Sequence, residues 1–203
     1  MGKGNAVVAI LGSSELSGTY NSAVIARNNL ESHNIFVIDS RAVTLGAGLL
    51  VIKAARLAHE GKSAEDIVDD IEEAKDRTKQ FFIVGSLKYL YKGGRISLSA
   101  SVLGSILNIK PIITMADGKL EMMEKTRGIK KAISIMMDNI KTNGWTLDGK
   151  VIGINHTLCP EQADYIEEII NMSFKPKEII RGEVGSVVGT HAGPGCVALH
   201  FEL

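Results

Sequence analysis

Aromatic residues and cysteines are scarce in this chain, and neither sign of charge is in excess. Phe, Tyr and Trp together make up 5% of the 203 residues, so aliphatic side chains must fill most of the interior. The formal net charge is zero, which argues against nucleic-acid binding because phosphate neutralisation needs an excess of Lys and Arg. No apolar run is long enough to span a bilayer, so we expect no membrane-spanning helix.

The two cysteines, Cys159 and Cys196, are far apart in the sequence. We expect a reducing, cytoplasmic setting in which both are small buried apolar side chains. Residues 1–11 hold one Lys and a short apolar run without a cleavage site, so no signal peptide is expected. The length suits one large domain or two small ones.

The stretch from Ala6 to Ala23 organises the rest of the prediction. Its apolar start, residues 6–11, is rich in β-branched residues and predicts a strand buried on both faces. Gly12 ends that run, and a helical spacing of apolar residues follows a polar turn. The turn would therefore lie at the carboxyl end of a strand, where open α/β sheets bind ligands.

Hydroxyl groups crowd this turn, which holds Ser13, Ser14, Ser17 and Thr19. Together with the unpaired N–H groups at a helix N-terminus, they suit a carboxylate or a phosphate. The alternative is that one of the serines merely caps the helix. The glycine fingerprints of dinucleotide sites and P-loops are absent from the turn.

The next elements alternate between strand and helix patterns. We expect a strand at 35–38, helices at 44–60 and 63–78, and a strand at 81–85. Ser63 opens the second helix with a capping-box pattern. The alternation predicts parallel pairing, and we assign residues 1–88 to an N-terminal α/β lobe.

The composition changes after residue 85, and residues 91–97 read as an irregular hinge after a short helix at 86–90. The second lobe, residues 89–203, is expected to be α+β with a mixed, partly antiparallel sheet. Its expected elements are a helix at 100–107, a β-hairpin of 110–115 and 119–125, a helix at 128–143, strands at 150–156, 178–184 and 196–201, a helix at 161–172, and a helix or loop at 185–195.

Three cationic side chains stand in unusual local sequences. Arg95 lies in a Gly-Gly-Arg-Ile-Ser segment, Arg127 follows the predicted hairpin, and His191 lies in a Gly- and Pro-rich segment. Each has an alternative structural role, as an ion-pair partner or a packed histidine. His156 near Cys159 is too weak a signal for a metal site, and G-x-S-x-G, H-E-x-x-H and C-x-x-C motifs are absent.

Five segments together resemble the DegV family of bacterial fatty-acid-binding proteins. They occur in the family's order and span essentially the whole chain: residues 13–20 (SSELSGTY), 90–97 (LYKGGRIS), 107–113 (LNIKPII), 125–128 (KTRG) and 189–195 (GTHAGPG). The resemblance implies a two-domain α/β protein that holds one long-chain fatty acid between its lobes, without a cofactor. It further implies that the carboxylate is presented to a separate fatty acid kinase of the dihydroxyacetone-kinase type.

The resemblance also implies roles for particular residues. The fatty-acid carboxylate would be bound by Ser17, His191, Ser14, Gly18 and Thr19. Arg95 and Arg127 resemble the family's basic residues near the pocket mouth, where contacts with the partner or the acyl-phosphate fall.

Family members usually carry a further N-terminal segment whose Thr contacts the carboxylate, and this sequence starts after it. The first lobe is therefore expected to be incomplete, with an exposed sheet edge that invites pairing in a homodimer. Two alternatives stay open: an acyl or phosphoryl transferase that uses His191 as a general base, and a truncated fragment that binds no lipid.

Overall fold

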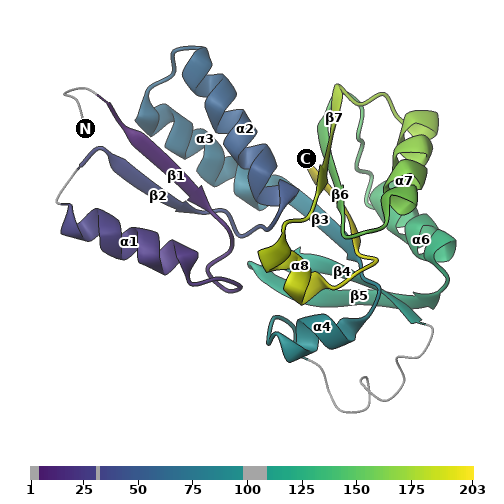
Figure 1. Cartoon of the computed structure of the whole chain (residues 1–203). Helices are drawn as coiled ribbons and strands as arrows, with labels where there is room; N and C mark the ends of the chain where they lie inside the picture. The colour runs from purple at the N-terminus through teal and green to yellow at the C-terminus, as the bar shows by residue number, and fades with distance from the viewer. Residues whose placement is uncertain (1–4, 31–32, 98–108) are drawn as a thin grey trace.

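The computed structural model describes residues 5–30, 33–97 and 109–203. They form two lobes, one around a small parallel sheet and one around a larger mixed sheet (Figure 1). This confirms the predicted fold class. The helix expected at 100–107 lies outside the described residues.

The first lobe is a three-layer arrangement around a two-stranded sheet. Strands β1 (Val7–Leu11) and β2 (Ile35–Asp39) pair in parallel. Helix α1 (Thr19–Asn29) lies on one side, and α2 (Leu45–His59) and α3 (Ala64–Arg77) lie on the other (Figure 1). The core of this lobe is formed between the sheet and α2 and α3.

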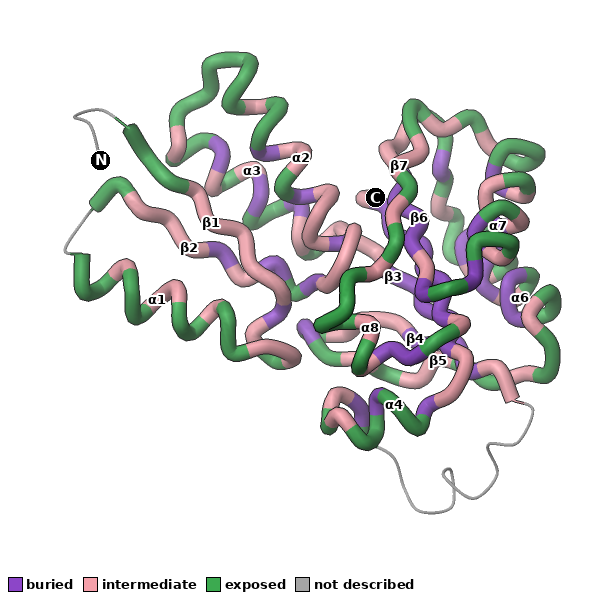
Figure 2. Tube along the Cα trace, in the orientation of Figure 1, coloured by how far each residue is buried: buried purple, intermediate pink, exposed green. Residues whose placement is uncertain are grey.

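β1 is not buried on both faces, so that expectation was wrong. Its residues are exposed or half-buried, and Val7 is 42% exposed. The physical reason is that a sheet of two strands gives little cover and that α1 contributes no buried residue. Figure 2 shows how few buried positions this part of the molecule has.

The second lobe is built on a six-stranded sheet with the order β5-β4-β3-β8-β6-β7. Every neighbouring pair is antiparallel except β6 and β7, which are parallel. The strands are β3 (Thr78–Ile83), β4 (Ile109–Ala116), β5 (Lys119–Arg127), β6 (Val151–His156), β7 (Glu178–Glu183) and β8 (Val197–Glu202).

Helices cover both faces of this sheet. On one face, α6 (Ile129–Thr142) and α7 (Pro160–Ser173) enclose the main core. On the opposite face lie the short helices α4 (Leu87–Lys92) and α8 (Ser186–Ala192). None of the helices in the described ranges is long and apolar enough to cross a bilayer.

Alternation along the strands decides which side chains face which layer. In β8, Leu199 and Phe201 join the main core, whereas Ala198 and His200 turn to the opposite face. In the same way, Ile154 of β6 faces the main core and Asn155 the other side. The second face is therefore the one that carries polar side chains.

The parallel pairing predicted for the strand at 81–85 was wrong. β3 is antiparallel to both neighbours, because the last strand, β8, returns to the centre of the sheet and pairs with it. Sheet membership alone would divide the chain between β2 and β3, and the boundary at residues 88/89 stays a prediction. Tyr91 and Lys92, expected in an irregular hinge, belong to α4.

Two local predictions were confirmed. The N–H of Asp66 donates to Ser63 Oγ at 3.1 Å and caps α3. Asp117 and Gly118 both have positive φ angles, 47° and 78°, and join β4 to β5 in a tight hairpin.

Candidate functional site: an apolar pocket between the lobes

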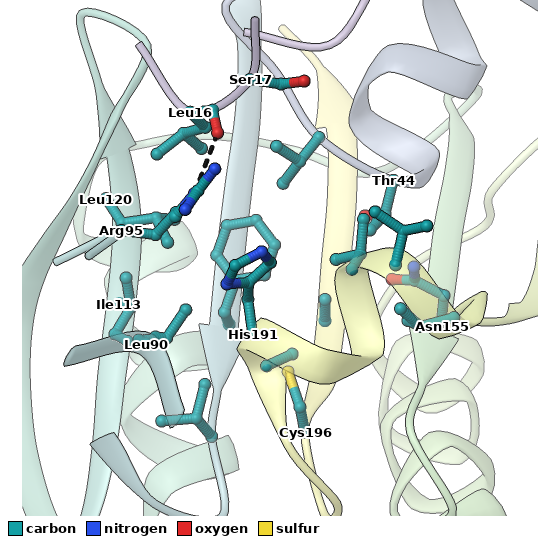
Figure 3. Close-up of a pocket in the computed structure, with 18 residues that line it drawn as sticks. Leu16, Ser17, Thr44, Leu90, Arg95, Ile113, Leu120, Asn155, His191 and Cys196 are labelled. Carbon is teal, nitrogen blue, oxygen red and sulfur yellow. Dashed lines mark hydrogen bonds between the residues drawn. The ribbon is translucent and has the colours of Figure 1, made fainter. Parts of the chain in front are cut away.

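A pocket lies where the first lobe meets the second face of the six-stranded sheet (Figure 3). It encloses about 850 Å³, its opening to solvent included, which is within the range of small-molecule sites. Its walls are mostly apolar and come from both lobes: Leu16, Val43, Phe82, Val84, Leu90, Ile113, Leu120, Val184, Val187, Val188, Ala192 and Ala198. Such a lining suits a long apolar ligand.

Ser17 lines this pocket from the turn that follows β1. Its Oγ accepts a hydrogen bond from the N–H of Thr19 at 3.3 Å and lies 2.9 Å from Thr19 Oγ1. The N-cap of α1 is Gly18, so Ser17 supports the first turn of the helix from one position earlier. The half-buried hydroxyl therefore serves the helix start and still faces the pocket.

The other serines of the turn have structural partners. Ser14 Oγ donates to Asp39 Oδ2 at 2.5 Å, and its N–H donates to Asp39 Oδ1 at 3.2 Å. Ser13 Oγ donates to the carbonyl of Gly118 at 2.6 Å and so ties the turn to the β4–β5 hairpin. Neither serine lines the pocket, and the exposed Gly18 and Thr19 do not line it either.

His191 lines the pocket from α8, in the other lobe. Its Nδ1 is buried without a hydrogen-bond partner in the described part of the chain, and it packs against Gly93 at the end of α4. This leaves Nε2 as the ring nitrogen that can reach a ligand. The structure thus brings Ser17 and His191 to one pocket, as Figure 3 shows.

Arg95 also lines the pocket and connects its two sides. Its Nε donates to the carbonyl of Leu16 at 3.1 Å, and its Nη1 donates to the carbonyl of Gly93 at 2.6 Å. Arg127 lies elsewhere, exposed at the last position of β5. Along an extended strand it is about 23 Å from Leu120, the β5 residue in the pocket wall.

Sequence reasoning missed a polar group in the pocket wall. Thr44 and Asn155 line the pocket, and behind them His200 is fully buried. His200 Nε2 lies 2.9 Å from Asn155 Oδ1 and 3.3 Å from Thr44 Oγ1. Burial lowers the pKa of His200 to about 3. The available signal was a polar residue, His200, inside an otherwise apolar strand pattern.

No group of three or more His, Cys, Asp or Glu residues that could hold a metal occurs in the ranges that the structure describes. The N–H of Cys159 donates to His156 Nδ1 at 3.4 Å, and its Sγ contacts the carbonyl of Cys196 at 3.2 Å. Burial raises the pKa of the Cys159 thiol and raises that of Cys196 to about 12. Both cysteines are buried thiols, as expected.

These features define a two-lobed α/β protein with an apolar ligand pocket between the lobes. The chain belongs to the DegV family: the model of the family described as "Uncharacterised protein, DegV family" matches residues 2–203. It is 44% identical to a DegV domain-containing protein of Caldanaerobacter subterraneus, over 97% of this chain and 70% of the relative. A DegV domain-containing protein of Clostridium perfringens is 37% identical, over 98% of this chain and 70% of the relative.

Solved structures of DegV proteins share this fold. One, described as a fatty-acid-binding DegV family protein from Thermus thermophilus, is 27% identical with a TM-score of 0.91, over 98% of this chain and 71% of that one. Another, from Eubacterium eligens and loaded with heptadecanoic acid, is 27% identical with a TM-score of 0.89, over 99% of this chain and 74% of that one.

Proposed function

We propose that this chain binds one long-chain fatty acid in the pocket between its lobes and presents the carboxylate to a separate fatty acid kinase. The observation that carries the proposal is that Ser17 and His191, from different lobes, line the same apolar pocket. Family membership supports it, because DegV proteins of the same fold are described as binding fatty acids.

Burial of the hydrocarbon tail supplies the affinity in this proposal. Each buried CH₂ group contributes about 0.8 kcal/mol, so a tail of about fifteen gives on the order of 10 kcal/mol before the costs of association. The mostly apolar lining fits that purpose. The polar rim then has a different task, which is to orient the ligand.

The carboxylate would lie between Ser17 Oγ and His191 Nε2. Hydrogen bonds to a charged acceptor are the strong ones, and here they offset the loss of carboxylate hydration. Ser14 is a less suitable contact than the sequence motif indicates, because both of its donors are engaged by Asp39. Gly18 and Thr19 would act through the start of α1 near the head group.

Presentation to a kinase assigns the phosphate chemistry to the partner, consistent with the absence of a P-loop pattern from the sequence. Arg95, whose donors are held by two backbone carbonyls at the pocket, would stay near the head group. Arg127, exposed and remote along β5, would contact the partner rather than the ligand. Homodimerisation stays a prediction.

The test is fatty-acid binding by the double variant Ser17→Ala, His191→Ala, measured by native mass spectrometry and by titration with hexadecanoic acid. We expect at least a tenfold loss of affinity, because two charge-assisted hydrogen bonds are removed. Ser22→Ala is the matched control: Ser22 Oγ donates only to the Gly18 carbonyl at 3.2 Å, in the same segment, and does not line the pocket. Equal affinity in the double variant and the control would contradict the proposal.

The kinase step is tested separately from binding. Acid-loaded protein, a fatty acid kinase and ATP should yield an acyl-phosphate, whereas the loaded protein and ATP alone should not. Turnover of an acyl ester or phosphate without a partner would instead favour a transferase that uses His191.

A further inference from the structure

The pocket has a second polar region that the binding of a carboxylate does not use. Ser17, Arg95 and His191 are the residues assigned to the head group, whereas Thr44 and Asn155 lie on the other side of the pocket (Figure 3). The apolar residues Phe82 and Ala198 also line the pocket. An unsubstituted hydrocarbon would leave this region without a partner.

His200 fixes which group Asn155 offers to the pocket. The imidazole is fully buried, and its burial keeps it neutral, so it carries a single N–H. The Nε2–H form donates to Asn155 Oδ1 at 2.9 Å and leaves only a lone pair on the enclosed Nδ1. Because Oδ1 is engaged by His200, the amide nitrogen of Asn155 is the group left for the cavity.

The amide nitrogen of Asn155 has no hydrogen-bond partner in the described ranges, although the residue is only 3% exposed. A donor in such a place is costly when an apolar ligand displaces water from it, because its lost hydration is not replaced. The same donor rewards a ligand that brings an acceptor to it. An unpartnered, buried donor that lines a cavity therefore points to a ligand group.

Thr44 supplies a second, independent observation. It has a positive φ of 50°, which is unusual for a β-branched residue. The Val43 N–H, one residue earlier, donates to the buried Gln80 Oε1 at 3.2 Å and helps to hold this conformation. Strained residues of this kind cluster at ligand sites. Here the strain places a hydroxyl 3.3 Å from His200 Nε2, in the pocket wall.

From these contacts we infer that the pocket selects acyl chains that carry a hydroxyl group within the tail, held by Asn155 and Thr44. The hydroxyl oxygen accepts from Asn155 Nδ2, and the O–H exchanges a hydrogen bond with Thr44 Oγ1. The inference rests on the proposed function, in which the carboxylate lies at Ser17 and His191. It adds that the ligand is a hydroxy fatty acid, bound in preference to the unsubstituted acid of equal length.

The test is a positional scan with the delipidated wild-type protein. Hexadecanoic acid is compared with hexadecanoic acids that each carry one hydroxyl at a different carbon. We expect one position to bind about tenfold more tightly than the unsubstituted acid. If hexadecanoic acid binds and no hydroxylated acid binds more tightly, this inference falls and the proposed function stands. If no acid in the series binds, both fall.

Variants assign the preference to its residues. Thr44→Val keeps the shape of the side chain, and Asn155→Leu replaces the donor with an apolar group of similar size. Each should abolish the preference and bind hexadecanoic acid at least as tightly as the wild type does. Ser17→Ala should instead weaken all the acids by the same factor and leave the preference intact. Retention of the preference in both Thr44→Val and Asn155→Leu would overturn the assignment, and the wild-type scan decides the inference if Asn155→Leu does not fold.

Discussion

His191 Nδ1 packs so closely against Gly93 that a methyl group on Gly93 would overlap the imidazole ring. The two residues belong to different elements, since Gly93 ends α4 and His191 lies in α8. The glycine thus sets the position of the imidazole in the pocket wall. Neither residue's local sequence reveals this contact.

Gly93→Ala should therefore displace His191 and weaken fatty-acid binding by about tenfold, which corresponds to the loss of one charge-assisted hydrogen bond. Titration with hexadecanoic acid measures the effect. Gly189→Ala is the control on the same helix as His191, because its new methyl group meets only the Val184 carbonyl, at 3.9 Å. Equal affinity of Gly93→Ala and Gly189→Ala would show that the imidazole position does not matter.

The hydroxyl of Thr157 organises the segment that follows α8. Its Oγ1 donates to the Gly193 carbonyl at 2.5 Å and accepts from the N–H of Cys196 at 2.9 Å. Thr157→Val should lower the free energy of unfolding by about 1–3 kcal/mol, because it leaves buried backbone groups unpaired. Urea denaturation measures this change. Thr157→Ser retains the hydroxyl and should recover most of the stability; equal losses in both variants would assign the effect to packing.

The buried imidazole of His200 predicts how stability depends on pH. Its pKa is about 3 in the folded protein and about 6.5 in the unfolded chain, so the unfolded state binds more protons between these values. Stability should fall by about 1.4 kcal/mol for each pH unit from pH 6.5 toward pH 3. His200→Gln removes this contribution, so the variant should lose less stability than the wild type between pH 7 and pH 5. Parallel urea-denaturation profiles would contradict the prediction.

Glu202 of β8 connects the sheet to two helices of the other lobe. It pairs with Lys53 at 2.8 Å and with Arg77 at 2.9 Å, and about 30% of each of the Lys53 and Glu202 side chains is exposed. Glu202→Gln should cost about 0.5–1 kcal/mol at low salt and less at high salt, because partly exposed pairs are weak and screened. Thermal denaturation at two ionic strengths checks this, and a loss that does not depend on salt would exclude an electrostatic origin.

The site could be predicted in part. The hydroxyl-rich turn after the first strand pointed to Ser17, and the family motif in the Gly-Thr-His-Ala-Gly-Pro-Gly segment pointed to His191. The motif could not show that Ser14 is engaged by Asp39 or that Arg127 is remote along β5, because a motif does not record where side chains point. The assignment of the carboxylate to these residues stays a prediction.

The polar wall of the pocket was not predictable in the same way. Thr44, Asn155 and His200 come from three segments that are far apart in the chain. Each has an ordinary local role, as a helix start, a strand end or a strand interior. Their meaning arises from cross-strand register, which places His200 beside Gly153 and next to Asn155.

By itself, the sequence determined which segments are helices and strands and which family the chain belongs to. Those properties depend on neighbours a few residues apart, through apolar periodicity, turn chemistry and helix caps. Only the tertiary structure decided that β8 returns between β3 and β6, and this return reverses the expected pairing of β3 and carries Ala198 and His200 to the pocket side. Strand order depends on contacts between distant segments, which local patterns do not encode.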